Sequence, residues 1–131
     1  MSEENVEIVR RFYDAYERGD LDSAFAAFDP EVEAYDHDIP ESREYRGFAG
    51  LLRWQADWEA SWASWRWEPE DFIDAGDRVV AVLRVHAKGR ESGVDLERVD
   101  GAVWTLREGK CVRHDYYGSK AEALEAAGLS E

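Results

Sequence analysis

The sequence predicts an α+β fold in which three N-terminal helices cover one face of a curved antiparallel sheet. Two observations support this fold class. Apolar residues recur at helical spacing up to about Trp62, and from Trp67 onward they alternate with a period of two. The predicted order is helix, helix, strand, helix and then four long strands, which is typical of an α+β domain. A curved sheet closed by helices forms a cone, and a cone of this kind can hold a small-molecule cavity.

The first two helices are predicted from their start and stop residues. The first begins in the polar segment Ser2 to Asn5 and ends at Gly19. The second starts at Asp20 and stops at Asp29, because the residue before a proline disfavours the helical conformation. The predicted inner faces carry Val6, Val9, Phe12, Tyr13 and Tyr16 in the first helix, and Leu21, Ala24, Phe25 and Phe28 in the second.

A short alternating strand, Val32 to Asp36, follows, and residues 37–47 are predicted to form a loop. The third helix is predicted from about Phe48 to Trp62. Its tryptophans, Trp54, Trp58 and Trp62, with Trp65 beyond them, are spaced by four, four and three residues and share one helical face. We expect this face to pack on the sheet and to wall an apolar pocket.

The four long strands are bounded by turn residues. They are predicted at Trp67 to Ile73, Arg78 to Ala87, Val94 to Leu106 and Cys111 to Tyr117, and a short helix from Lys120 to Ala127 follows. The tight turn at residues 107–110 joins the last two strands, and Gly109 supplies the positive φ that such a turn needs.

Length and composition limit the function classes. The 131 residues are enough for one domain, which we expect to span residues 1–131. A formal net charge of −14 argues against nucleic-acid binding and against anionic membrane surfaces. The sequence has no long apolar run, and it has only one cysteine, Cys111. We therefore expect a cytoplasmic protein without an internal disulfide.

Several segments resemble the nuclear transport factor 2-like superfamily, and within it the SnoaL-like group of polyketide cyclase-like and ketosteroid isomerase-like proteins. The similar segments are VRRFYDAYERGD from Val9, FDPEVE from Phe28, Tyr45-Arg46-Gly47, DAGDRVV from Asp74, VWTLREGK from Val103 and AEALEAAG from Ala121. The resemblance covers nearly the whole chain. It implies a cystatin-like α+β roll, and it implies a homodimer formed through the outer face of the sheet. It leaves function open, because this fold hosts isomerases, cyclases, hydrolases and non-catalytic binders.

Alternation along the strands predicts which side chains enter the cone. One face carries Arg84 and His86, the next strand contributes Asp100 and Trp104, and the last contributes His114 and Tyr116. The opposite orientation of this strand would place Val79, Ala81, Leu83 and Val85 inside the cone. Because those residues are apolar, the alternation does not decide between the two orientations. Phe12, Tyr16, Trp54 and Trp58 are expected to complete the ligand-binding walls.

Three enzyme templates of the superfamily each require particular residues. For ketosteroid isomerase, Asp36 falls at the position of the base, but Phe12 and Ala102 replace both oxyanion donors, which disfavours this reaction. For limonene epoxide hydrolase, the Arg-x-Asp pair becomes Arg84-x-His86 and Asp115 is expected to point outward. For a polyketide cyclase, the general base could be Asp36, Asp100 or Asp115.

The sequence therefore predicts a protein that binds a small apolar or aromatic molecule. It could be a cofactor-free isomerase or cyclase in which Asp36 or His86 accepts a proton, while Arg84, Tyr116 or His114 stabilises negative charge. The alternatives are a non-catalytic binder, epoxide hydrolase-like activity and a module whose cone is mostly filled. No metal site is expected, because His37, His86 and His114 lack a short ligand spacing.

Overall fold

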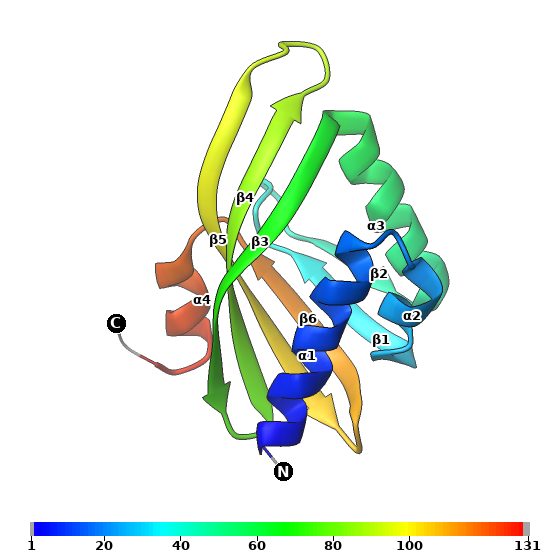
Figure 1. Cartoon of the computed structure of the whole chain (residues 1–131), viewed down its shortest axis with the longest axis vertical. Helices are drawn as coiled ribbons and strands as arrows, with labels where there is room; N and C mark the ends of the chain where they lie inside the picture. The colour runs from blue at the N-terminus through cyan, green and yellow to red at the C-terminus, as the bar shows by residue number, and fades with distance from the viewer. Residues whose placement is uncertain (1, 130–131) are drawn as a thin grey trace.

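The structure, a computed structural model, describes residues 2–129 and has the predicted α+β architecture (Figure 1). Six strands form one curved, open sheet in the order β2-β1-β6-β5-β4-β3. None of the helices within these residues is long and apolar enough to cross a membrane. The elements are α1 Ser2–Glu17, α2 Leu21–Phe25, β1 Phe28–Asp36, β2 Arg43–Arg46, α3 Gly47–Ser61, β3 Trp62–Ala75, β4 Arg78–Gly89, β5 Asp95–Arg107, β6 Lys110–Tyr117 and α4 Lys120–Ala126.

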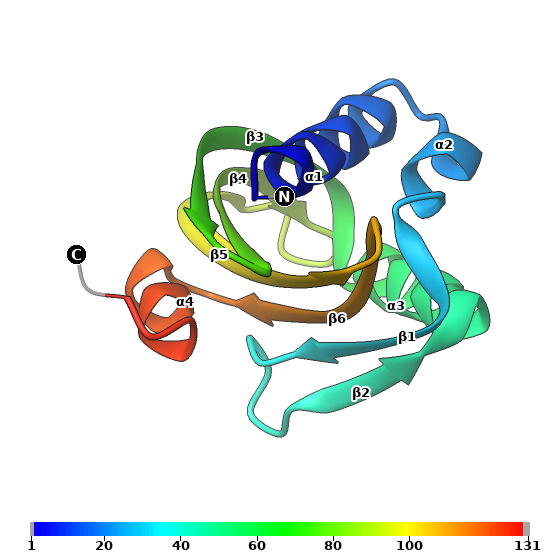
Figure 2. The same cartoon turned by 90° about the horizontal axis from the view of Figure 1, so that it is seen from below.

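The sheet is antiparallel except at one pair of strands. β3, β4, β5 and β6 pair antiparallel in sequence order, and β1 pairs antiparallel with β2. β1 runs parallel to β6, with Ala34 beside His114 and Asp36 beside Tyr116. Figure 2 shows the sheet curving beneath α1. The parallel pair matters because it places the end of β1 next to the last strand, where the polar residues of the site gather.

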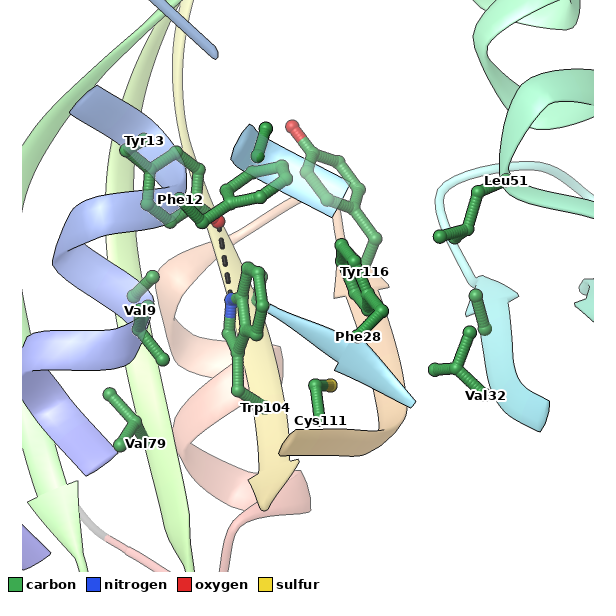
Figure 3. Packing of buried hydrophobic residues seen from close by; sticks show 14 of the residues in the cluster. Val9, Phe12, Tyr13, Phe28, Val32, Leu51, Val79, Trp104, Cys111 and Tyr116 are labelled. Atoms are coloured by element: carbon green, nitrogen blue, oxygen red, sulfur yellow. Dashed lines mark hydrogen bonds between the residues drawn. The ribbon is translucent and has the colours of Figure 1, made fainter. Parts of the chain in front are cut away.

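The main core lies between the concave face of the sheet and helices α1, α2 and α3. Val9 and Phe12 of α1 face Val79 and Trp104 of the sheet, and all four are buried (Figure 3). The Trp104 ring stacks on Phe28 with a centroid distance of 5.2 Å and lies 4.9 Å from Phe12. The helical spacing of these apolar residues thus gives α1 its packing face.

The convex face of the sheet is covered in part by α4. Val80, Val82 and Val103 form a second cluster with Ala123 and Leu124 of this helix. Because β4 is apolar on both faces, the alternation in its sequence does not show which face lies inside. This helix accounts for the apolar second face of the strand within the single chain.

Some boundaries differ from the sequence prediction. Phe28 and Pro30 belong to β1 instead of ending the second helix, and the predicted loop contains the short strand β2. α3 ends at Ser61, and the strand β3 begins at Trp62. The tryptophan stripe is therefore split between a helix and a strand.

Candidate functional site

An apolar pocket lies between the helices and the concave face of the sheet. Its volume is about 60 Å³, and one side opens to solvent. None of its lining residues is Asp, Glu, Lys or Arg. The lining side chains are Phe12, Tyr13 and Tyr16 from α1, Phe25 from α2, Leu51, Trp54, Gln55 and Trp58 from α3, and Phe28, Trp65, Trp67, His114 and Tyr116 from the sheet.

Four tryptophans and a tyrosine form much of the wall. Trp54 and Trp58 are four residues apart on α3, and Trp65 and Trp67 are two residues apart on β3, so each pair faces one side of its element. The Trp58 ring lies 5.5 Å from Trp65, 5.4 Å from Trp67 and 5.5 Å from Tyr116 between centroids. Inclined aromatic pairs at these distances contribute stabilising free energy beyond that of the apolar area they bury. These contacts therefore hold the rings of the wall in a defined arrangement.

His114 is one of two pocket-lining residues, with Trp65, that have a buried side-chain nitrogen without a hydrogen-bond partner among the described residues. Its ring lies 4.7 Å from Trp104 and 5.5 Å from Trp54 between centroids. Within residues 2–129 its buried Nδ1 has no hydrogen-bond partner. Burial lowers the pKa of His114 from 6.5 to about 4, so the ring is neutral near pH 7. A buried polar atom without a partner is costly, and a ligand that bonds to it removes that cost.

Tyr116 connects the pocket to a buried carboxylate. Its hydroxyl donates to Oδ2 of Asp100 over 2.5 Å and accepts from Nε1 of Trp67 over 3.1 Å. Asp100 is fully buried. Burial and the negative charge of Asp100 raise the pKa of Tyr116 well above its usual value. The Tyr116 side chain is therefore neutral, and its hydroxyl proton is already engaged in the hydrogen bond to Asp100.

Arg98 compensates the charge of Asp100 and joins it to Asp38. Its Nε donates to Asp100 and its terminal nitrogen to Asp38, each over 2.5 Å. The hydrogen bond that Arg98 donates to Asp100 holds the pKa of Arg98 above its usual value. Burial raises the pKa of Asp38 although Arg98 opposes this shift. Gly118 lies against this pair, and a Cβ at Gly118 would overlap Asp38.

The sequence prediction did not include Arg98 or Asp38 among the site residues. A usable signal was the spacing of Arg98 and Asp100, which puts both on one face of β5, since a buried carboxylate requires a cationic partner. Asp38 had no such signal. It reaches Arg98 only because β1 pairs with β6. Tyr13, Gln55 and Trp67 also line the pocket without having been predicted, and Trp67 could have been found from its alternation with Trp65.

Asp36, the predicted general base, is buried at the end of β1 but does not line the pocket. Its Oδ2 accepts from Nε1 of Trp54 over 3.0 Å, and its Oδ1 accepts from the backbone N–H of Asp38 over 2.9 Å. Both oxygens thus orient neighbouring groups. Asp36 positions Trp54 in the pocket wall.

The predicted orientation of Arg84 and His86 is wrong. Both lie on the convex face and are partly exposed. Nε of Arg84 lies 2.8 Å from Glu70. The two ring nitrogens of His86 lie 3.0 Å from Glu68 and 3.3 Å from Glu97. These groups form a surface ion-pair network away from the pocket.

The pairing of β4 with β5 is the physical reason for this correction. Residues directly opposite in an antiparallel pair point to the same face. Ala81 pairs with Ala102 and Leu83 with Asp100, so Leu83 shares the concave face with Asp100. Arg84 is therefore turned to the convex side, which is the orientation that the sequence left open as the alternative.

The remaining predicted residues lie at or behind the pocket. Phe12, Tyr16, Trp54, Trp58, His114 and Tyr116 line it. Asp100 and Trp104 lie behind this lining, bonded to Tyr116 and Tyr13 respectively. The hydroxyl of Tyr16 donates to Gln55 and so links α1 to α3, and burial raises the pKa of Tyr16 to about 12.

Asp115 points to the convex face, opposite Val103. Nε2 of His37 lies 2.8 Å from its Oδ1, and Nε of Arg113 lies 2.9 Å from its Oδ2. Burial alone would raise the pKa of Asp115, but the hydrogen bonds from Arg113 and His37 outweigh burial and hold that pKa below its usual value. His37 is thus on the opposite face of the sheet from His114.

The comparisons with known proteins agree with this architecture. A family model described as "SnoaL-like domain" matches residues 9–114. The chain belongs to the SnoaL-like domain family. No curated protein sequence matches the chain.

Three solved structures illustrate the fold of this SnoaL-like protein. An NTF2-like protein of unknown function from Burkholderia pseudomallei has a TM-score of 0.80 at 23% identity, covering 93% of this chain and 95% of its own. TerC, co-crystallized with polyporic acid, has a TM-score of 0.79 at 22% identity over 95% and 98%. A hypothetical protein with a ketosteroid isomerase-like fold from Catenulispora acidiphila, in complex with trimethylamine, has a TM-score of 0.74 at 18% identity, covering 94% of this chain and 93% of its own.

Proposed function

We propose that this SnoaL-like protein binds a small apolar or aromatic molecule in the pocket between its helices and its sheet. The observation that carries the proposal is an aromatic pocket that opens to solvent and has no charged lining residue. Such concave apolar sites with a few polar atoms are typical of small-molecule sites. Asp36, Arg84 and His86 do not meet at the pocket. An acid-base enzyme that used these three residues would need them close together. The co-crystallization of TerC with polyporic acid supports a small-molecule ligand in this fold.

Leu51 offers a direct test, because it is buried in the pocket wall while the adjacent Leu52 is 54% exposed. Leu51→Trp fills the pocket, and Leu52→Trp adds the same side chain to the surface of the same helix. Toluene binding is measured by NMR through the indole N–H signals of the six tryptophans. We expect wild type and Leu52→Trp to bind toluene and folded Leu51→Trp to lose binding by at least about tenfold.

Equal binding by the two tryptophan variants would place toluene outside the pocket and refute the proposal. Leu51→Ala provides a second arm in case Leu51→Trp does not fold. This substitution enlarges the pocket, so the affinity for the larger o-xylene is expected to rise relative to toluene. An unchanged ratio also counts against the pocket.

A second candidate function is favoured by one observation, the hydrogen bond from Tyr116 to Asp100 at the pocket wall. The Tyr116 oxygen could take an α-proton from a carbonyl-bearing ligand while the Tyr116 proton moves to Asp100, so that the negative charge passes from Asp100 to the ligand enolate. The reverse relay then returns a proton to another carbon of the enolate and restores the Asp100 carboxylate beside Arg98. This relay needs no cofactor. In a screen of carbonyl substrates, Asp100→Asn should abolish turnover and Asp36→Asn should retain most of it. Equal rates for Asp100→Asn and wild type would refute this candidate.

Pairing of two copies through the convex face stays a prediction. The exposed part of this face carries Arg84 and His86 beside three glutamates, Glu68, Glu70 and Glu97. Light scattering tests the pairing directly, since a monomer has a mass of 15.0 kDa and a homodimer has twice that mass.

A further inference from the structure

We infer that the ligand of this pocket is a neutral, single-ring hydroxy-aromatic molecule of the phenol class, whose hydroxyl group hydrogen-bonds Nδ1 of His114. The inference rests on the proposed function and names its ligand class. Three features of the pocket carry it: the volume, the absence of charge and the position of the atoms without hydrogen-bond partners.

The volume limits the ligand to one ring. The pocket measures about 60 Å³, less than half of the roughly 150 Å³ of an engineered protein cavity that binds benzene. A single ring therefore fits only with part of the ring in the open mouth, and a second ring would lie outside the pocket. Fused-ring molecules are therefore expected to bind less tightly than single-ring molecules.

The lining argues for a neutral ligand. An ionised group transferred from water into an apolar site needs a counter-charge, and the lining residues supply none. Asp100, the buried carboxylate that hydrogen-bonds Tyr116, is already compensated by Arg98. The lowered pKa of His114 points the same way, because burial disfavours a cation at this place.

The unpartnered atoms locate the polar group of the ligand. Most polar side chains of the wall are bonded to the protein, as Tyr16 to Gln55, Trp54 to Asp36, and Trp67 and Tyr116 to each other. Among the described residues, the buried side-chain nitrogens without a partner are Nδ1 of His114 and Nε1 of Trp65, and both belong to pocket-lining residues.

A hydroxyl group suits the nitrogen of His114 whichever tautomer the neutral ring adopts. It donates to an unprotonated Nδ1 and accepts from a protonated one. A methyl group in the same place leaves the nitrogen unpaired. The pocket should therefore prefer phenol to toluene, although the two molecules have nearly the same shape.

The test compares five ligands on the intact protein by calorimetry, with the indole N–H signals reporting contact with the pocket. Phenol should bind at least about tenfold more tightly than toluene, and more tightly than benzoate, benzylamine and 1-naphthol. His114→Leu should bring the phenol-to-toluene affinity ratio to about one. His114→Asn, which keeps a hydrogen-bonding side chain, should retain a preference for phenol.

The outcomes separate this inference from the proposed function. Toluene binding as tightly as phenol, or tighter binding of 1-naphthol or a charged ligand, overturns the ligand class and leaves a ligand-binding pocket in place. A preference for phenol that persists in His114→Leu overturns the role of His114. If none of the five ligands binds wild type, the proposed function fails and the inference fails with it. The wild-type series decides the ligand class even if the variants do not fold.

Discussion

The burial of His114 predicts a specific loss of stability in acid. In the folded protein its pKa lies at about 4, against 6.5 for the exposed group. Above the unfolded pKa, both states carry a neutral ring and the pH has little effect. As the pH falls from 6.5 towards about 4, the unfolded state binds the proton first, so the free energy of unfolding decreases. Each pKa unit corresponds to about 1.4 kcal/mol, and the loss between about pH 7 and pH 5 is roughly 2 kcal/mol.

The assay is urea unfolding of wild type and His114→Leu at both pH values. Other titrating groups are shared by the two proteins, so the difference between their pH dependences isolates the histidine. Wild type should lose roughly 2 kcal/mol more than the variant between about pH 7 and pH 5. Equal losses would show that His114 protonates normally in the folded state, and the account of a dry, neutral pocket wall would be wrong.

Five further substitutions test the packing of the sheet and the corrected orientation of β4. A Cβ at Gly101 would lie 2.5 Å from the Cβ of Ala123, so Gly101→Ala should destabilise the protein by about 1–3 kcal/mol. Adding Ala123→Gly should recover part of that loss in a double-mutant cycle, and simple additivity would argue against the contact. Arg84→Gln and His86→Gln should each change the free energy of unfolding by less than about 1 kcal/mol and leave toluene binding unaltered; a loss of binding would return them to the site. Trp104→Ala should cost about 3–5 kcal/mol, measured by urea unfolding, since the ring is fully buried, and a loss below about 1 kcal/mol would contradict its central place in the core.

The sequence predicts the fold class well because its strongest signals are local. The helical spacing of Val9 and Phe12 identifies α1 and its packing face. The Gly109 turn locates the last hairpin, and Gly109 has a φ of 80° in the structure. The boundary at Trp62 was missed because a tryptophan spacing of four continues across the junction from helix to strand.

The site was harder to predict because its geometry depends on pairing between distant strands. β4 is apolar on both faces, so alternation alone did not decide whether Leu83 or Arg84 faced inward. The register of β4 against β5 decides it, and the turn between them does not reveal that register in the sequence. The Arg98–Asp38 contact likewise joins residues 60 positions apart.

A crystal structure with 4-bromophenol is the most direct measurement of the ligand pocket, because the anomalous signal of bromine locates the ring independently of the protein density. We predict a bromine peak in the mouth of the pocket, with the hydroxyl group within hydrogen-bonding distance of Nδ1 of His114. A saturated crystal with bromine only on the outer surface, and none between the helices and the concave face of the sheet, would contradict the assignment of this pocket as the functional site.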